Sequence, residues 1–266
     1  ARGHRLTKAT PSIPRRADYG HGCYRRAIKL EGDPTSVRGE LVDDFHHFAV
    51  ELRVDAGHVQ EITGEDIRVP WTTCPGALAP LRSMVGAPVT ASILDLHRFT
   101  PPQSQCTHLH DLACLAVAHA ARLSHPGEAA RRYDVSLPDR QSGKTYAELS
   151  RNGEGVLSWS LARGIIESAT PKDFQGAPLT GRPFKEILIS LGESDAIEAA
   201  WVLQRAIFVG TGRRHDFERM TVATEFASVV GGSCYSFATE RVSKARKVPN
   251  TVRDFSDSST ASFDRE

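Results

Sequence analysis

The sequence predicts an α+β fold in which antiparallel β-sheet packs against two to three long helices. Residues 24–67 alternate apolar and polar side chains, with turn signals between the runs, as in an antiparallel meander. Residues 133–161 return to this alternation around Asn152-Gly153, a hairpin signature. Residues 107–123 and 194–210 place apolar side chains three and four positions apart, which is the spacing of a helix with one buried face.

Turn and capping residues mark where the other elements begin and end. Gly32-Asp33-Pro34-Thr35 separates the first two strands, and Asp55-Ala56-Gly57 precedes a strand over residues 59–67. A first helix is expected over residues 73–85, because a threonine can cap it and Pro75 suits its first turn. These signals predict an antiparallel meander followed by helices.

Composition and charge limit the classes of partner. The chain has 266 residues, of which 40% are hydrophobic and 24% charged, enough to bury a substantial core. Its 33 Lys and Arg residues balance 32 Asp and Glu residues, so we expect no nucleic-acid partner. No apolar run approaches the roughly 20 residues that span a bilayer, so we expect no membrane partner.

The two ends of the sequence differ in composition from its middle. We predict a basic N-terminal arm over residues 1–22, a single α+β domain over 23–242 and a polar tail over 243–266. The tail is expected to be disordered or to reach a neighbouring subunit of a homodimer or other homo-oligomer. The arm lacks the apolar core of a signal peptide, and the five cysteines are irregularly spaced, so the expected location is the cytoplasm. No internal repeat is visible.

Common cofactor motifs are absent from the sequence. It contains no P-loop, no HExxH and no GxSxG. Gly210-Thr211-Gly212 follows a predicted helix, whereas a dinucleotide-binding glycine loop follows a strand. We therefore expect no cofactor and look for chemistry among the histidine, cysteine and acidic residues.

Residues 42–54 are expected to form one strand with a buried face. The even-numbered positions are apolar except for Asp44 and His46, which period-two geometry places about 6–7 Å apart on that face. A carboxylate beside an imidazole can fix its tautomer and raise its basicity, as a general base requires. Alternatively, His46 is a core histidine bonded to a backbone carbonyl, and Asp44 caps a turn. His47 is expected on the opposite face, in solvent.

Two predicted helix starts carry further candidates. At Cys106-Thr107-His108 the helix dipole favours an anion, Thr107 can cap the helix and His108 can donate to a carboxylate or phenolate. Cys74 lies at the start of the first helix, a position that can lower a thiol pKa, although a lone cysteine is more often a small buried apolar residue. Further along, Tyr133 and Arg140 are outer candidates for substrate binding, and a surface ion pair explains Arg140 equally well.

The same side chains also allow a metal site. Cys74, Cys106, His46 and His108 together supply two thiolates and two imidazoles, a ligand set that suits zinc. Each ligand comes from a different element, however, and no CxxC pair anchors the set. A zinc-dependent hydrolase or a structural zinc protein is therefore one alternative, and a non-catalytic binding or assembly protein is another.

Taken in order, these residues resemble the bacterial DUF2889 family, a domain of unknown function. The resemblance extends over about residues 24–212 and is carried by His46, Cys74-Pro75 and Cys106-Thr107-His108. His47 stands where the resemblance implies an acidic residue in many relatives, so no role for that carboxylate is carried over. The resemblance implies bacterial catabolism of aromatic compounds, including lignin degradation by cofactor-free decarboxylation.

We therefore predict a cofactor-independent lyase that decarboxylates a phenolic or lignin-derived aromatic acid. A quinone methide formed from the phenol can take up the electrons of the bond to CO2, so the protein has only to hold the acid and move a proton. His46, oriented by Asp44, is the expected base, and His108 is the expected acid or anion binder. The residues expected to bind the substrate are Thr107, Cys74, Cys106, Tyr133 and Arg140.

Overall fold

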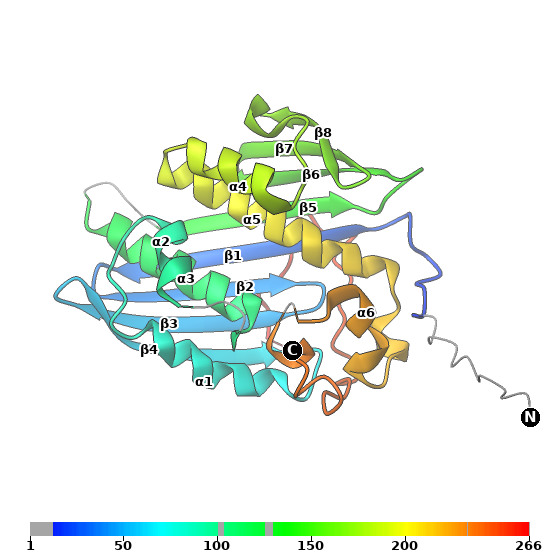
Figure 1. Cartoon of the computed structure of the whole chain (residues 1–266), viewed down its shortest axis with the longest axis horizontal. Helices are drawn as coiled ribbons and strands as arrows, with labels where there is room; N and C mark the ends of the chain where they lie inside the picture. The colour runs from blue at the N-terminus through cyan, green and yellow to red at the C-terminus, as the bar shows by residue number, and fades with distance from the viewer. Residues whose placement is uncertain (1–12, 101–103, 126–129, 233, 266) are drawn as a thin grey trace, which may run out of the picture.

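Eight antiparallel strands form a single sheet in the computed structural model, which describes residues 13–100, 104–125, 130–232 and 234–265. The strand order is β4-β3-β2-β1-β5-β6-β7-β8, so the first and fifth strands meet at its centre. All of the long helices lie on one face of this sheet (Figure 1). The predicted α+β fold with an antiparallel sheet is confirmed.

The sheet consists of two meanders of four strands. The first contains β1 (Cys23–Asp33), β2 (Ser36–Asp43), β3 (His47–Asp55) and β4 (His58–Arg68). The second contains β5 (Arg131–Pro138), β6 (Lys144–Arg151), β7 (Glu154–Ala162) and β8 (Ile165–Thr170). At the predicted hairpin, Asn152 and Gly153 both have positive φ, at 52° and 86°, as a type I′ turn requires.

Two helices of 17 residues cover the sheet, α3 (Thr107–Leu123) over β1 to β3 and α5 (Ser194–Gly210) over β5 to β7. Shorter α-helices are α1 (Leu78–Leu81), α2 (Ile93–Phe99), α4 (Gly181–Ser190) and α6 (Ala227–Val230). The 3-10 helices that the described residues form in full are η1 (Cys74–Ala77), η2 (Arg82–Met84), η4 (Lys172–Phe174), η5 (Thr211–Arg214), η6 (Phe217–Arg219), η7 (Ala223–Glu225) and η8 (Tyr235–Phe237). Within the described ranges, no helix is long and apolar enough to cross a membrane.

The first predicted helix, over residues 73–85, is wrong in detail. The chain there forms η1, α1 and η2 in succession. Pro80 has no N–H to continue an α-helical ladder, and its ring crowds the carbonyl four residues earlier, which accounts for the break.

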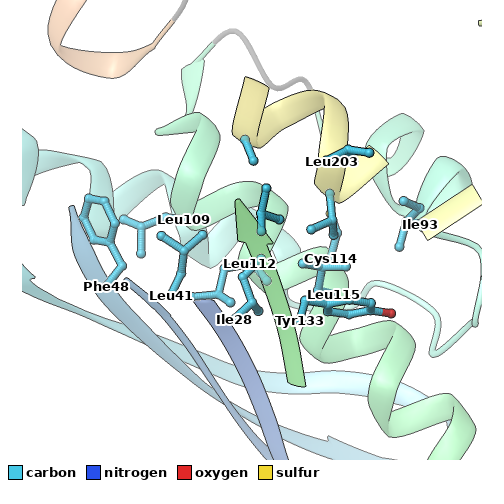
Figure 2. Close-up of a cluster of buried hydrophobic side chains, with 14 of the residues drawn as sticks. Ile28, Leu41, Phe48, Ile93, Leu109, Leu112, Cys114, Leu115, Tyr133 and Leu203 are labelled. Carbon is cyan, nitrogen blue, oxygen red and sulfur yellow. The ribbon is translucent and has the colours of Figure 1, made fainter. Parts of the chain in front are cut away.

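The core lies between the sheet and the two long helices. Figure 2 shows Ile28, Leu41 and Phe48 of the strands facing Leu109 and Leu112 of α3. All five side chains are buried. Burial of one such side chain stabilises the folded state by about 1.5–3 kcal/mol. This apolar layer therefore fixes the position of α3 on the sheet.

The two long helices run antiparallel. Asp111 near the start of α3 binds Arg205 near the end of α5, with Oδ2 and Nε 3.1 Å apart. Arg122 at the end of α3 binds Glu198 near the start of α5. The start of α3 therefore lies beside the end of α5.

The topology repeats, although no repeat is visible in the residues. Each half of the sheet is a four-stranded meander followed by a 17-residue helix, and the two halves are arranged symmetrically about the β1–β5 pair. Burial patterns that are equivalent in three dimensions can be satisfied by unrelated apolar residues, so sequence comparison of the halves does not detect this repeat.

The polar tail, expected to be disordered or to reach a neighbouring subunit, packs on the sheet of its own chain. Ala261, Phe255 and Phe263 cover Ala27 and Val42 on the face opposite the long helices. A few apolar residues among the serines are sufficient to anchor the tail. Residues 1–12 of the predicted arm lie outside the described residues.

Candidate functional site

A cavity of about 410 Å³ lies where the β2–β3 turn, the start of α3 and the end of α5 meet. Residues of η5, η6 and η8 complete its walls. The lining is rich in aromatic side chains: Phe45, Phe48, Trp71, Phe208, Phe217, Phe226, Tyr235 and Phe237. A largely apolar cavity with a few convergent polar groups is the usual form of a small-molecule site.

The β2–β3 turn places His46 at this cavity. Asp43 N–H donates to the carbonyl of His46 at 2.8 Å, which closes the turn. Asp43 Oδ1 accepts from the backbone N–H groups of Phe45 and His46 at 2.8 and 2.9 Å. These local bonds compete with an extended strand, as aspartate side chains commonly do. The prediction that residues 42–54 form one strand, with Asp44 and His46 on the same face, is therefore wrong.

Asp43 is the carboxylate that orients His46. Its Oδ1 lies 3.1 Å from Nδ1 of the His46 ring. Its Oδ2 accepts from the Tyr24 hydroxyl at 2.9 Å and from Arg26 Nη2 at 2.6 Å. Burial by itself raises the pKa of this carboxyl, but its contacts with His46 and the Arg26 guanidinium lower it well below the usual range. Asp43 is therefore an ionised carboxylate inside the protein.

Asp44, the predicted partner of His46, has a different role. Its carboxylate is buried and binds the Arg213 guanidinium, which also donates to Asp139 at 3.0 Å. These contacts tie the turn to η5 and to the end of β5. Asp44 does not line the cavity, so we assign it a structural role.

The His108 ring lies against the His46 ring, tilted by 30° from it. The two ring centroids are 3.9 Å apart, and both rings line the cavity. Burial, followed by the proximity of His46, lowers the pKa of His108 well below its usual range, so this imidazole is neutral near pH 7. Its Nε2 is buried and has no hydrogen-bond partner among the residues that the structure describes. An unpartnered buried nitrogen at a cavity wall is suited to binding a ligand.

Asp43, His46 and His108 form the His46 corner at the cavity, and the hydrogen bonds of Asp43 limit how well this corner could bind a metal ion. Asp43, His46 and His108 each offer one ligand atom within 4.8 Å of the other two. However, both oxygens of Asp43 already accept hydrogen bonds from Tyr24, Arg26, Phe45 and His46. The predicted set of Cys74, Cys106, His46 and His108 is not among the groups of close ligand atoms found in the described part of the chain.

The model of the family described as "Protein of unknown function (DUF2889)" matches residues 29–122. Residues 29–122, about a third of the chain, are therefore similar to this family. The match runs from β1 through α3 and includes Asp43, His46, Cys74 and His108, whereas the resemblance was predicted to reach residue 212. No curated protein matches the chain.

The two cysteines of the matched segment that line the cavity, Cys74 and Cys106, are neutral thiols. Burial raises the pKa of Cys74 to about 12 and raises that of Cys106 well above its usual value. Cys74 is therefore the small buried residue that the sequence favoured. A helix start does not lower its pKa, because removal from water outweighs the effect of the short helix. Cys234, outside the matched segment, lines the same cavity.

The other predicted residues lie in different surroundings. Thr107 lines the cavity but caps nothing, since Cys106 is the capping residue of α3. Tyr133 and Arg140 lie away from the cavity, and they donate to Glu198 and to the Gly143 carbonyl, respectively. The prediction that His47 is solvated is wrong: the side chain is buried, and its Nε2 lies 2.7 Å from Glu40 Oε1.

Sequence reasoning missed two groups of cavity residues. Asp43 could have been recognised, because Asp43-Asp44 between two apolar runs is a turn signal, and an aspartate that starts a turn bonds the residues that follow. Arg205 and Arg214, which supply positive charge to the wall, lie beyond the segment that matches the family model. No local pattern places them beside His46.

Proposed function

We propose that the protein is a cofactor-independent lyase that decarboxylates a phenolic aromatic acid, with His46 as the general base. The observation that carries the proposal is the ionised, buried Asp43 on Nδ1 of His46, which leaves Nε2 of His46 as the nitrogen that exchanges a proton. A carboxylate in this position fixes the tautomer of the imidazole and stabilises its protonated form.

The proposed reaction needs one proton and no external electron acceptor. His46 removes the phenolic proton of a substrate whose carboxylate is conjugated to the ring. Electrons move through the ring, and the carbon that bears the carboxylate takes up a proton, which gives a quinone methide. The C–C bond to the carboxylate then breaks, its electron pair restores the aromatic phenolate, and CO2 leaves. The phenolate regains its proton from His46, and the proton added to the carbon comes from solvent, so the net reaction consumes one proton and releases CO2.

The cavity walls suit such a substrate. The cavity has a volume of about 410 Å³ and an aromatic lining, which suit one aromatic acid and keep it among apolar side chains. Arg205 and Arg214 at the wall can bind the carboxylate, and neutral His108 can donate to the phenolate or its ring substituents. A cavity lined by both histidines supports an enzyme over a non-catalytic assembly protein.

A zinc-dependent hydrolase is the second candidate, favoured by the close ligand atoms of Asp43, His46 and His108. Metal binding there would have to displace hydrogen bonds that Asp43 accepts from Tyr24 and Arg26. We rank it second for this reason.

The test is turnover of a panel of phenolic acids and their O-methyl ethers, with CO2 and the vinyl or aryl product measured. We expect turnover only where the phenol is free. The matched control for His46→Ala is His58→Ala, which removes an exposed histidine elsewhere on the sheet. Activity that survives chelation supports the lyase. CO2 release that is lost on chelation and restored by zinc contradicts a cofactor-independent lyase, and equal turnover of phenols and ethers overturns the proposal. Zinc-dependent hydrolysis of aryl esters with no CO2 release supports the hydrolase.

A further inference from the structure

A second group of histidine and cysteine side chains lies outside the cavity, between α2 and α3. His97 comes from α2, whereas His110 and Cys114 come from α3, four residues apart and therefore on the same side of that helix. None of the three lines the cavity. His108 and His110 are two residues apart on α3, so they point to different sides, one toward the cavity and one toward α2.

The three side chains have the spacing of a metal site. Each offers one ligand atom within 4.8 Å of the other two. The rings of His97 and His110 have centroids 4.8 Å apart. Zinc ligands lie about 2.0–2.3 Å from the ion, so small side-chain rotations would bring these atoms to coordination distance.

One ring nitrogen of His110 makes a hydrogen bond, and this bond orients the other nitrogen, which is free. Its Nε2 lies 2.7 Å from the Thr100 hydroxyl, whereas its Nδ1 is buried and has no hydrogen-bond partner among the described residues. A hydrogen bond on one ring nitrogen that leaves the other free is the usual outer-shell arrangement of a metal-binding histidine.

His97 lies near a carboxylate, although its Nε2 makes no hydrogen bond within the described residues. Its Nε2 lies 3.3 Å from Oδ1 of Asp111, and Asp111 is held in turn by Arg205 and by the indole N–H of Trp201. The Trp201 ring packs on His97, with centroids 4.4 Å apart. This packing restricts the position of the His97 ring and links α2 to α5.

The chemical state of the three groups is compatible with zinc. Burial lowers the pKa of His97 and lowers that of His110 to about 4, so both imidazoles keep their lone pairs near pH 7. Burial also keeps Cys114 as a thiol, and binding of zinc would displace its proton to form the thiolate. Figure 2 shows Cys114 among the apolar side chains of Ile93, Leu115 and Leu203.

We propose that His97, His110 and Cys114 bind one zinc ion that ties α2 to α3, with a water molecule as the fourth ligand. Two imidazoles and one thiolate form a ligand set suited to tetrahedral zinc. The site is independent of the proposed lyase, because it shares no ligand with the His46 corner.

The test uses the full chain, stripped with a chelator and titrated with Co²⁺ and Zn²⁺. We expect one equivalent of Co²⁺ to give a thiolate charge-transfer band, and zinc to displace it and to raise the Tm. The band should survive in His46→Ala but not in Cys114→Ala or His110→Gln. Cys23→Ser, which alters a cysteine outside the group, is the matched control.

A milder variant keeps the test informative if the ligand variants do not fold. Thr100→Val keeps all three ligands and removes only the hydrogen bond to His110, so metal affinity should fall about 10–100-fold. Absence of binding to wild type, or binding that His46→Ala abolishes and Cys114→Ala leaves intact, overturns the proposal.

Discussion

The two halves of the molecule have equivalent corners, one at the start of α3 and one at the start of α5, and these corners differ in the side chains that fill them. In the first half, the β2–β3 turn meets the start of α3. In the second half, the β6–β7 hairpin precedes a comparable corner at the start of α5, where Arg151 at the end of β6 binds Asp195 in the first turn of α5, with Nη1 and Oδ2 2.9 Å apart. Because α3 and α5 are antiparallel, the two corners lie far from each other.

The corner at the start of α5 is filled by paired charges. Arg131 binds Asp195 at 2.9 Å, and the buried Glu198 accepts from Tyr133 and from Arg122. At the other corner, the buried carboxylate of Asp43 accepts from Tyr24 and Arg26 in a similar way. It also contacts the imidazole of His46, which lies with His108 at the wall of a cavity. The same topology thus supports a closed structural corner in one half and an open candidate site in the other.

Replacement of His46 tests the open corner and should have the largest effect. In His46→Ala the proposed base is absent, so kcat should fall about 10²–10⁴-fold, the usual contribution of general acid–base catalysis. The free energy of unfolding should change by less than about 2 kcal/mol, because the ring is partly exposed at the cavity. Steady-state kinetics and urea denaturation measure the two effects. A folded variant with full activity would contradict the assignment.

Replacement of Glu198 tests the closed corner. Glu198→Ala leaves Arg122 and Arg131 without their buried partner, so the free energy of unfolding should fall by about 3–5 kcal/mol. Under conditions where the variant is folded, kcat should be close to that of wild type. If the free energy of unfolding fell by less than about 1 kcal/mol, or if kcat fell as in His46→Ala, the Glu198 corner would not be a purely structural one.

The stability of the metal-free protein should depend on pH through His110. The pKa of His110 is lowered to about 4 from 6.5, so between these values the unfolded chain binds a proton that the folded chain does not. The free energy of unfolding should therefore fall as the pH is lowered from 6.5 to 4, by at most about 3 kcal/mol from this group. Urea denaturation of His110→Gln at several pH values should show a smaller fall. An identical pH dependence in the two proteins would contradict the prediction.

Two tyrosines give the smallest and most closely matched comparison. Tyr24→Phe and Tyr133→Phe each remove one hydroxyl that donates to a buried carboxylate, Asp43 or Glu198. Each should cost about 1.5–3 kcal/mol of stability, the range for hydrogen bonds to charged groups. Only Tyr24→Phe should also alter the pH profile of kcat, because Asp43 contacts His46. If the pH profiles of kcat were the same for the two variants, Asp43 would have no role in the reaction.

The sequence alone determined the fold class and the two long helices. Strand alternation, the Asn152-Gly153 turn and the apolar spacing of residues 107–123 and 194–210 are local patterns, and local backbone preferences decide them. The residue types at His46 and His108 also identified the corner where the cavity lies. These predictions depend on neighbours within a few positions of the chain.

The tertiary structure decided which groups act together. Whether Asp43 or Asp44 faces His46 depends on where one strand ends, and that depends on hydrogen bonds closing a turn between two packed strands. Arg205 reaches the cavity, and His97 reaches His110, only because α5 and α2 pack on α3. Such pairings join residues far apart in sequence, where no periodic pattern carries information, so packing alone sets them.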